Sequence, residues 1–223
     1  MLLLWPGWAA AQGCRLALLL ALDVSSSVDD AEYLLQRDGV AAALMSPDVQ
    51  NAILGSGGVA LGAYEWSGRR QSTLILDWTM LTTPAEIATA AAQIAGATRS
   101  FRRYPTAMGY ALGYGATMLR RAPSCERQVI DLSGDGITND GFGPIHAYRH
   151  FPFDNVTVNG LAVLGADPMV VDYFEFEVLH GPGAFLETAQ GYEGYARAME
   201  RKLYREIEDR VVGQASDLPG DAG

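Results

Sequence analysis

The sequence predicts a doubly wound α/β domain with a mainly parallel central sheet, one antiparallel hairpin strand and helices on both faces. Strand and helix signals alternate along the 223 residues. Two segments, 15–23 and 128–132, are nearly continuous apolar runs, as expected for strands that are covered on both faces of a parallel sheet. A single hairpin signal joins segments 59–66 and 72–78 through a turn at 67–70. This alternation is typical of an open, mainly parallel sheet.

The other elements are predicted from caps, glycines and prolines. Asp29 and Glu32 resemble an acidic capping box that opens a helix to about Met45. Thr83 and Pro84 open a helix that runs to about residue 95. A glycine-rich loop is expected at 55–58, further helices at 105–121, 144–150 and 192–211, and further strands at 156–164 and 185–188.

The chain is expected to form one domain, because it shows no internal repeat and no linker. Residues 12–212 are expected to form this domain. Residues 213–223, which are small and polar, are expected to form a flexible tail. Residues 1–11 are apolar and end in an Ala-x-Ala pattern, which predicts the remnant of a signal peptide. They lack the basic segment of a signal peptide, which suggests a start codon placed too late, and the alternative is an uninformative N-terminus. The chain has no run of about 20 apolar residues, so no transmembrane segment is expected.

Composition narrows the choice of partners. Hydrophobic residues make up 49% and charged residues 19% of the chain, which argues against disorder. The formal net charge of −10 disfavours nucleic acid and anionic membrane surfaces as partners, because like charges repel. The partners that this composition still allows are cations, basic ligands and acidic ligands that a metal ion bridges to the protein.

The only two cysteines, Cys14 and Cys125, each precede an apolar run that ends in an aspartate, at Asp23 and Asp135. If the two runs are adjacent parallel strands, the thiols lie at the same height and can form a disulfide. A disulfide would favour an oxidising compartment. Two inert thiols are the alternative in a reducing cytosol. Lipidation of Cys14 is a third interpretation, which Gln12 disfavours.

Three short motifs stand at strand ends or at the start of a helix. The first is Asp-x-Ser-x-Ser at residues 23–27, the second is a threonine at the predicted start of helix 105–121, and the third is Gly-Asp-Gly at 134–136. Together they resemble the metal-ion-dependent adhesion site (MIDAS) of von Willebrand factor A domains, and the resemblance covers nearly all of residues 14–210. It implies a Rossmann-like fold and one set of metal ligands, Asp23, Ser25, Ser27, Thr106 and Asp135.

Such a ligand set suits a small hard cation. Mg²⁺ takes about six oxygen ligands, usually including water, and Mn²⁺ or Ca²⁺ are close alternatives. Three of the protein oxygens are neutral hydroxyls, so the ion remains electrophilic and keeps a position for a carboxylate of a partner, as the resemblance implies. Each motif also has a purely structural interpretation: a serine-rich helix cap, a threonine cap and a tight turn.

Further stretches are similar to one bacterial family within this superfamily, the domain of unknown function 1194. These stretches are residues 21–27, 64–68, 130–135, 148–153 and 156–160.

A basic cluster precedes Thr106. Arg102, Arg103 and Tyr104, with Arg99, could form a rim that attracts an acidic partner, and a solvated loop is the alternative. Core packing is expected for Trp66, although its ring could also add to an aromatic edge.

Signals for catalysis are weak. His146 and His150 have the spacing of zinc peptidases, but Ala147 stands where the general base is required. Ser133 lacks the Gly-x-Ser-x-Gly elbow of hydrolases, and no Gly-x-Gly-x-x-Gly follows the first strand. No catalytic residue is therefore predicted.

The sequence predicts a non-enzymatic, metal-dependent binding module of the bacterial envelope, periplasmic or secreted. Its expected partner is a protein that presents an acidic side chain. The alternatives are a metal-assisted hydrolase that uses the same ion and a cytosolic partner of an ATPase assembly.

Overall fold

A six-stranded sheet forms the centre of the protein, whose computed structural model describes residues 13–208. Its strands are β1 (Cys14–Asp23), β2 (Val59–Trp66), β3 (Ser72–Leu81), β4 (Cys125–Gly134), β5 (Val156–Leu164) and β6 (Leu186–Gln190). Their order across the sheet is β3-β2-β1-β4-β5-β6. Among these strands β3 alone runs antiparallel to its neighbour, β2, and all other neighbours are parallel. The predicted fold class is confirmed.

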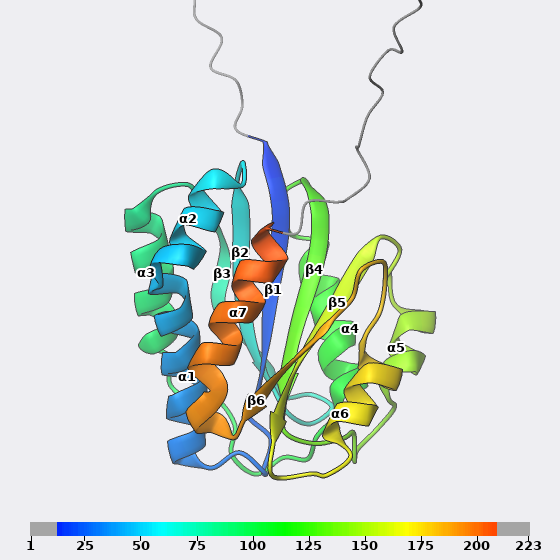
Figure 1. Cartoon of the computed structure of the whole chain (residues 1–223). Coiled ribbons are helices and arrows are strands. Elements are labelled where there is room, and N and C mark those ends of the chain that lie inside the picture. Colours follow the sequence, from blue (N-terminus) through cyan, green and yellow to red (C-terminus); the bar gives the residue numbers. More distant parts are fainter. Residues whose placement is uncertain (1–12, 209–223) are drawn as a thin grey trace, which may run out of the picture.

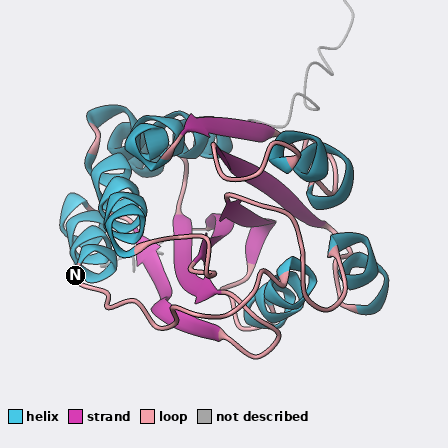
Figure 2. Ribbon diagram, turned by 90° about the horizontal axis from the view of Figure 1, so that it is seen from below, coloured by secondary structure: helices cyan, strands magenta, loops and turns pink. Residues whose placement is uncertain are grey.

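Helices cover both faces of the sheet (Figures 1 and 2). One group consists of α1 (Asp30–Met45), α2 (Pro47–Gly55), α3 (Pro84–Ala95) and α7 (Tyr195–Glu208), and the other of α4 (Met108–Leu119), α5 (Pro144–His150) and α6 (Val170–Tyr173). The side chains of β1 alternate between the two cores. Leu18 and Leu20 join the core that includes α1, α3 and α7, whereas Leu19 and Ala21 join the core that includes α4. This alternation explains the nearly continuous apolar run of β1.

The predicted capping box of α1 is present, and the predicted N-cap of α3, Thr83, also forms a capping box. Asp29 accepts a hydrogen bond from the backbone N–H of Glu32, whose side chain accepts one from the backbone of Asp29. Thr83 and Glu86 make the same reciprocal pair at the start of α3. These local hydrogen bonds explain why the predicted starts of α1 and α3 are correct within a residue.

Other element boundaries differ from the prediction. Helix α2 was not predicted, although Ser46 caps it and Pro47 occupies its first turn. Helix α4 begins at Met108 rather than at residue 105. Strand β6 lies slightly later than predicted. Helix α6 and the π-helical turn that continues it, Phe174–Val178, were not predicted. The last helix, α7, begins at Tyr195 after a 3₁₀ turn, Tyr192–Gly194, and its predicted end lies outside the described residues.

A disulfide joins Cys14 to Cys125 at the start of the two central strands, with the Cα atoms 4.4 Å apart. The two cysteines are register partners in the parallel pair β1–β4, as the sequence suggested. The bridge therefore holds the amino ends of the strands whose carboxyl ends are Asp23 and Gly134. Within residues 13–208, no helix has both the length and the apolar character needed to cross a bilayer.

Candidate metal centre

The predicted ligands lie at the carboxyl edge of the sheet. Asp23 is the last residue of β1, and Asp135 follows the last residue of β4. These strands are parallel neighbours at the centre of the sheet, so their ends meet at the same edge. The chain continues from β1 to β2 on one side, while β4 and β5 lie on the other. This is the switch point of a doubly wound sheet, where such folds bind ligands.

A path of hydrogen bonds connects four of the five predicted ligands. The backbone N–H of Ser25 donates to Asp23 Oδ1 at 2.7 Å. The hydroxyl oxygens of Ser25 and Ser27 lie 3.1 Å apart, and the Ser27 hydroxyl donates to Asp135 Oδ1 at 2.7 Å. The serine motif after β1 is thereby joined to the aspartate after β4.

Each of the two aspartates also has a carboxylate oxygen without a partner. Asp23 Oδ2 and Asp135 Oδ2 are both buried and make no hydrogen bond to the protein. Burial first, and then the negative charge of Asp135, raise the pKa of Asp23 to about 8. Burial is also the main cause of the raised pKa of Asp135. Two buried carboxylates, each with one oxygen that has no hydrogen-bond donor, form a place where a cation would be stabilised.

Thr106 is placed next to this edge by its backbone. Its N–H donates to the Asn139 side chain at 2.9 Å, and its carbonyl accepts from the Asn139 N–H at 2.9 Å. The Ser26 N–H donates to the carbonyl of Tyr104 at 2.9 Å, which joins the threonine loop to the serine loop. Because α4 begins two residues later, at Met108, and its N-cap position is Ala107, Thr106 does not cap this helix. The expectation that Thr106 opens the helix was therefore wrong.

Arg99 belongs to the interior and not to an exposed rim. Its side chain is only 5% exposed, and its Nη2 donates to the carbonyl oxygens of Val24, Ser25 and Val28 at 3.3, 3.1 and 2.6 Å. These carbonyls lie in the loop that carries the serines. Arg99 therefore fixes the backbone of this loop, a role that the sequence interpretation missed because the contacts span about 70 positions of the chain.

The other members of the basic cluster are exposed. Arg102 and Arg103 lie at the surface, and Tyr104 is 43% exposed. The Nε of Arg102 lies 3.1 Å from Asp30 Oδ1. The placement of these side chains is thus compatible with a rim beside the serine loop.

Two further side chains near the aspartates were not predicted as site residues. Tyr192 is 4% exposed, and its hydroxyl has no hydrogen-bond partner. Burial is the largest cause of its raised pKa, and the charges of Asp135 and Asp23 add to it. The indole N–H of Trp66 is also buried without a partner. No local sequence pattern identifies either residue, because an unpartnered buried donor is a property of the folded structure.

The donor set fits a hard cation. No group of three or more His, Cys, Asp or Glu side chains within residues 13–208 is arranged to hold a metal ion. An ion at the carboxyl edge would therefore depend on hydroxyl oxygens together with Asp23 and Asp135. Oxygen ligands of this kind suit Mg²⁺, Mn²⁺ or Ca²⁺.

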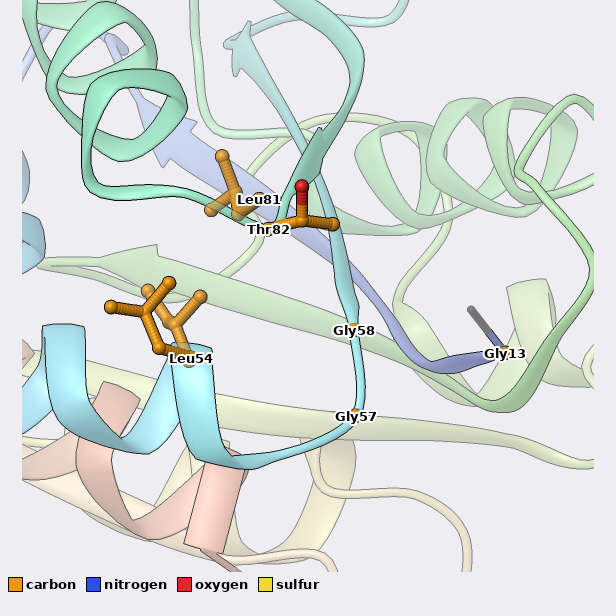
Figure 3. A pocket seen from close by; sticks show the side chains of 7 residues that line it. Gly13, Leu54, Gly57, Gly58, Leu81 and Thr82 are labelled. Carbon is orange, nitrogen blue, oxygen red and sulfur yellow. The ribbon is translucent and has the colours of Figure 1, made fainter. Parts of the chain in front are cut away.

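A pocket of about 210 Å³ lies elsewhere, lined in part by Gly13, Leu54 and Leu81 (Figure 3). Gly13 precedes β1, whereas Asp23 ends it, so this pocket lies at the opposite edge of the sheet from the candidate metal centre.

Solved structures share the fold at low sequence identity. Proximal thread matrix protein 1 from the mussel byssus, with zinc occupying its MIDAS motif, is 16% identical at a TM-score of 0.65, over 87% of this chain and 48% of that one. A von Willebrand factor type A protein from Catenulispora acidiphila is 13% identical at a TM-score of 0.61, over 87% and 43%. PilB minor pilin from Streptococcus sanguinis is 13% identical at 0.61, over 90% and 63%.

These likenesses define the class: the chain has the fold of a von Willebrand factor A domain, and it spans about half the length of the mussel protein. The chain belongs to the family described as Protein of unknown function (DUF1194), which matches residues 13–211. No curated protein matches the sequence.

Proposed function

We propose that this domain holds one divalent cation at Asp23, Ser25, Ser27, Thr106 and Asp135, and that the cation binds a carboxylate of a protein partner. The observation that carries the proposal is the hydrogen-bonded path from Ser25 through Ser27 to Asp135, beside two buried carboxylate oxygens without partners. The zinc-occupied motif of the mussel protein, which shares the fold, supports a divalent cation.

The ligand chemistry favours Mg²⁺ or Mn²⁺, with Ca²⁺ as the alternative. Zinc prefers nitrogen and sulfur ligands, and none of the five residues supplies one. Mg²⁺ is usually held by one or two carboxylates and keeps several water molecules. With Asp23 and Asp135 as its only charged protein ligands, the ion would keep a position that a partner's carboxylate can fill. The chemistry supplied by the ion is therefore the attraction of an anionic oxygen.

Binding is favoured over catalysis because the sequence has no histidine beside the metal-binding motifs that could act as a general base. The described residues around the two aspartates supply hydroxyls, backbone amides and the buried guanidinium of Arg99, and the negative charge of Asp167 also acts on Asp135. The exposed Arg102, Arg103 and Tyr104 would form a rim for neighbouring acidic groups of the partner. In a chain with a net charge of −10, the ion and this rim would be local positive features that orient an acidic ligand.

An extracytoplasmic location, periplasmic or secreted, fits the disulfide. Structural disulfides persist in oxidising compartments and are rare in the cytosol. The bridge between Cys14 and Cys125 joins the two central strands of the sheet. The proposed signal segment, residues 1–11, lies outside the described residues.

Calorimetry tests the metal site directly. We expect wild-type protein to bind one Mg²⁺ or Mn²⁺ ion, and Asp23→Asn or Asp135→Asn to abolish binding, because each removes a charge while keeping the side-chain shape. Ser26→Ala is the matched control, since Ser26 lies between the two ligand serines and is exposed. Equal binding by the wild-type protein and both Asn variants would contradict the proposed site.

Capture from bacterial envelope extract tests the partner. Immobilised wild-type protein and Ser26→Ala should retain the same protein in Mg²⁺ and release it in chelator. Thr106→Ala should retain it about tenfold less well, because one oxygen ligand of the ion is lost. If capture is the same for all three proteins with and without chelator, the partner binds elsewhere.

A further inference from the structure

Trp66 has an unused hydrogen-bond donor beside the metal centre. Its side chain is completely buried, and its indole Nε1 makes no hydrogen bond to the protein. Trp78, by comparison, donates its indole N–H to the carbonyl of Met118 at 3.1 Å. Buried donors in folded proteins nearly always have a partner, so the Trp66 indole calls for an explanation.

The neighbouring strand places Trp66 next to Asp23. β2 and β1 are parallel, Asp23 and Trp66 are register partners, and the Val24 N–H donates to the Trp66 carbonyl at 2.9 Å. Gly134 of β4 lies close to both side chains. A Cβ atom added to Gly134 would lie 3.1 Å from Asp23 Oδ2 and 3.5 Å from Trp66 Cζ2.

The unpartnered donor thus lies near an unpartnered acceptor, because Asp23 Oδ2 is also buried without a hydrogen bond. A Cβ atom at Gly134 would be in contact with both side chains, so the glycine allows them to lie close together. A buried polar group can be satisfied directly or through one ordered water molecule that finds other polar partners. The Trp66 indole and Asp23 Oδ2 are such partners.

We infer that Trp66 is a positioning residue of the metal centre. When the cation is bound, its indole N–H donates to the Asp23 carboxylate, directly or through one water molecule, and fixes the orientation of Oδ2. This inference rests on the proposed cation site. It adds a residue from β2 to a site whose other members follow β1 and β4 or precede α4.

Nuclear magnetic resonance gives a readout that a purely structural role would not change. Each tryptophan indole N–H gives one signal in a ¹H–¹⁵N spectrum. The signals of Trp66 and Trp78 are assigned with the variants Trp66→Phe and Trp78→Phe. On addition of Mg²⁺ we expect the Trp66 signal to move downfield and its hydrogen exchange to slow, because the N–H gains an acceptor. The Trp78 signal should stay in place, because this N–H already has one.

Affinity is the second readout. Replacing Trp66 by 3-benzothienylalanine keeps the ring shape and removes the N–H, so this variant is informative even if Trp66→Phe fails to fold. We expect its Mg²⁺ affinity to fall about two- to tenfold in calorimetry, the effect of one net hydrogen bond. Trp78→Phe is the matched control and should bind as the wild type does.

The outcomes separate the inference from the proposed function. If wild-type protein binds no divalent cation, the proposed function and the role of Trp66 both fail. If wild-type protein binds Mg²⁺ but the benzothienylalanine variant binds equally well and the Trp66 signal does not move, only the inference is overturned. Trp66 is then a core residue.

Discussion

At the scale of single residues, Arg99 shows how a buried charge can organise a binding loop. Its guanidinium donates to three carbonyls of the loop after β1, those of Val24, Ser25 and Val28. It also donates to the carbonyl of Phe101 at 2.7 Å. Without Arg99, the carbonyls of Val24 and Val28 would lose this buried donor, whereas the Ser25 carbonyl would keep the hydrogen bond from the Val28 N–H. The loop that carries Ser25 and Ser27 is therefore held from inside the protein.

Replacing this residue should destabilise both the fold and the site. Arg99→Met removes donors from several buried carbonyls, so we expect the free energy of unfolding to fall by about 3–5 kcal/mol in urea denaturation. Arg102→Met is the control, and because Arg102 is exposed its effect should stay below about 1 kcal/mol. A loss of equal size in both variants would argue against the loop-holding role of Arg99.

The acidic pair also predicts how stability depends on pH. The pKa of Asp23 is raised from 3.8 to about 8 in the metal-free protein. Between these values the folded protein binds more protons than the unfolded chain, so the free energy of unfolding should fall as the pH rises from about 4 to 8. Mg²⁺ binds the ionised carboxylates, so its stabilising effect should grow over the same range. Thermal denaturation at several pH values, with Mg²⁺ or chelator, measures both trends, and Asp23→Asn should weaken them.

At the scale of elements, helix α7 is attached to the sheet through a buried ionic cluster. The Nζ of Lys202 is buried and lies 3.1 Å from Asp131 Oδ1 of β4 and 3.1 Å from Glu206 Oε1 of its own helix. Asn159 of β5 donates to Glu206 Oε1 at 2.7 Å. Burial is the main cause that raises the pKa of Asp131 to about 7, although the charge of Lys202 opposes it. The lysine thus compensates two carboxyl groups in the interior.

Removal of the lysine should loosen α7. Lys202→Met leaves Asp131 and Glu206 without a cation, so we expect a loss of about 3–5 kcal/mol in the free energy of unfolding. Adding Glu206→Gln to this variant should restore part of the stability, because one buried negative charge is removed. Arg201→Met, on the exposed side of the same helix, should change stability little. A double variant no more stable than Lys202→Met would show that charge compensation is not the role of Lys202.

The elements that the sequence predicts well are those with local signals. A capping box located α1, Thr83 and Pro84 located α3, and apolar runs located β1 and the middle of β4. Helix α2 was missed although Ser46 and Pro47, directly after the predicted end of α1, are signals for a helix start. The start of α4 was placed too early because Pro105 and Thr106 resemble a helix start, whereas their loop is held by Asn139 and Ser67 from distant segments.

The candidate site likewise contains residues that a local sequence motif identifies and residues that only the folded structure identifies. Asp23, Ser25 and Ser27 lie in one short motif at the end of a strand, and Asp135 follows the apolar run of β4. The sequence alone could therefore identify them as candidate ligands. Arg99 could not be predicted, because its partners are backbone carbonyls about 70 positions away. For Trp66, burial was expected, but the unpartnered indole is visible only in the folded structure.

At the scale of the whole molecule, the disulfide closes a long segment of the chain. Cys14 and Cys125 are 111 positions apart, so the bridge restricts the unfolded chain strongly. We expect reduction to lower the free energy of unfolding by about 2–5 kcal/mol, measured in denaturant with and without reductant. A Cys14→Ser/Cys125→Ser protein is the control and should not respond to reductant. Two titratable thiols in folded protein from an oxidising compartment would contradict the bridge.

The position of this bridge has a mechanical consequence. A pull on a partner held at the ion would pass through Asp23 and Asp135 into two straight strands, and the far ends of these strands are covalently joined. The tension is then carried along backbone bonds of β1 and β4, and neither strand can slide out past the other while the sulfurs remain bonded. Under a load applied between Gly13 and the partner, the contact at the ion should rupture before the sheet shears.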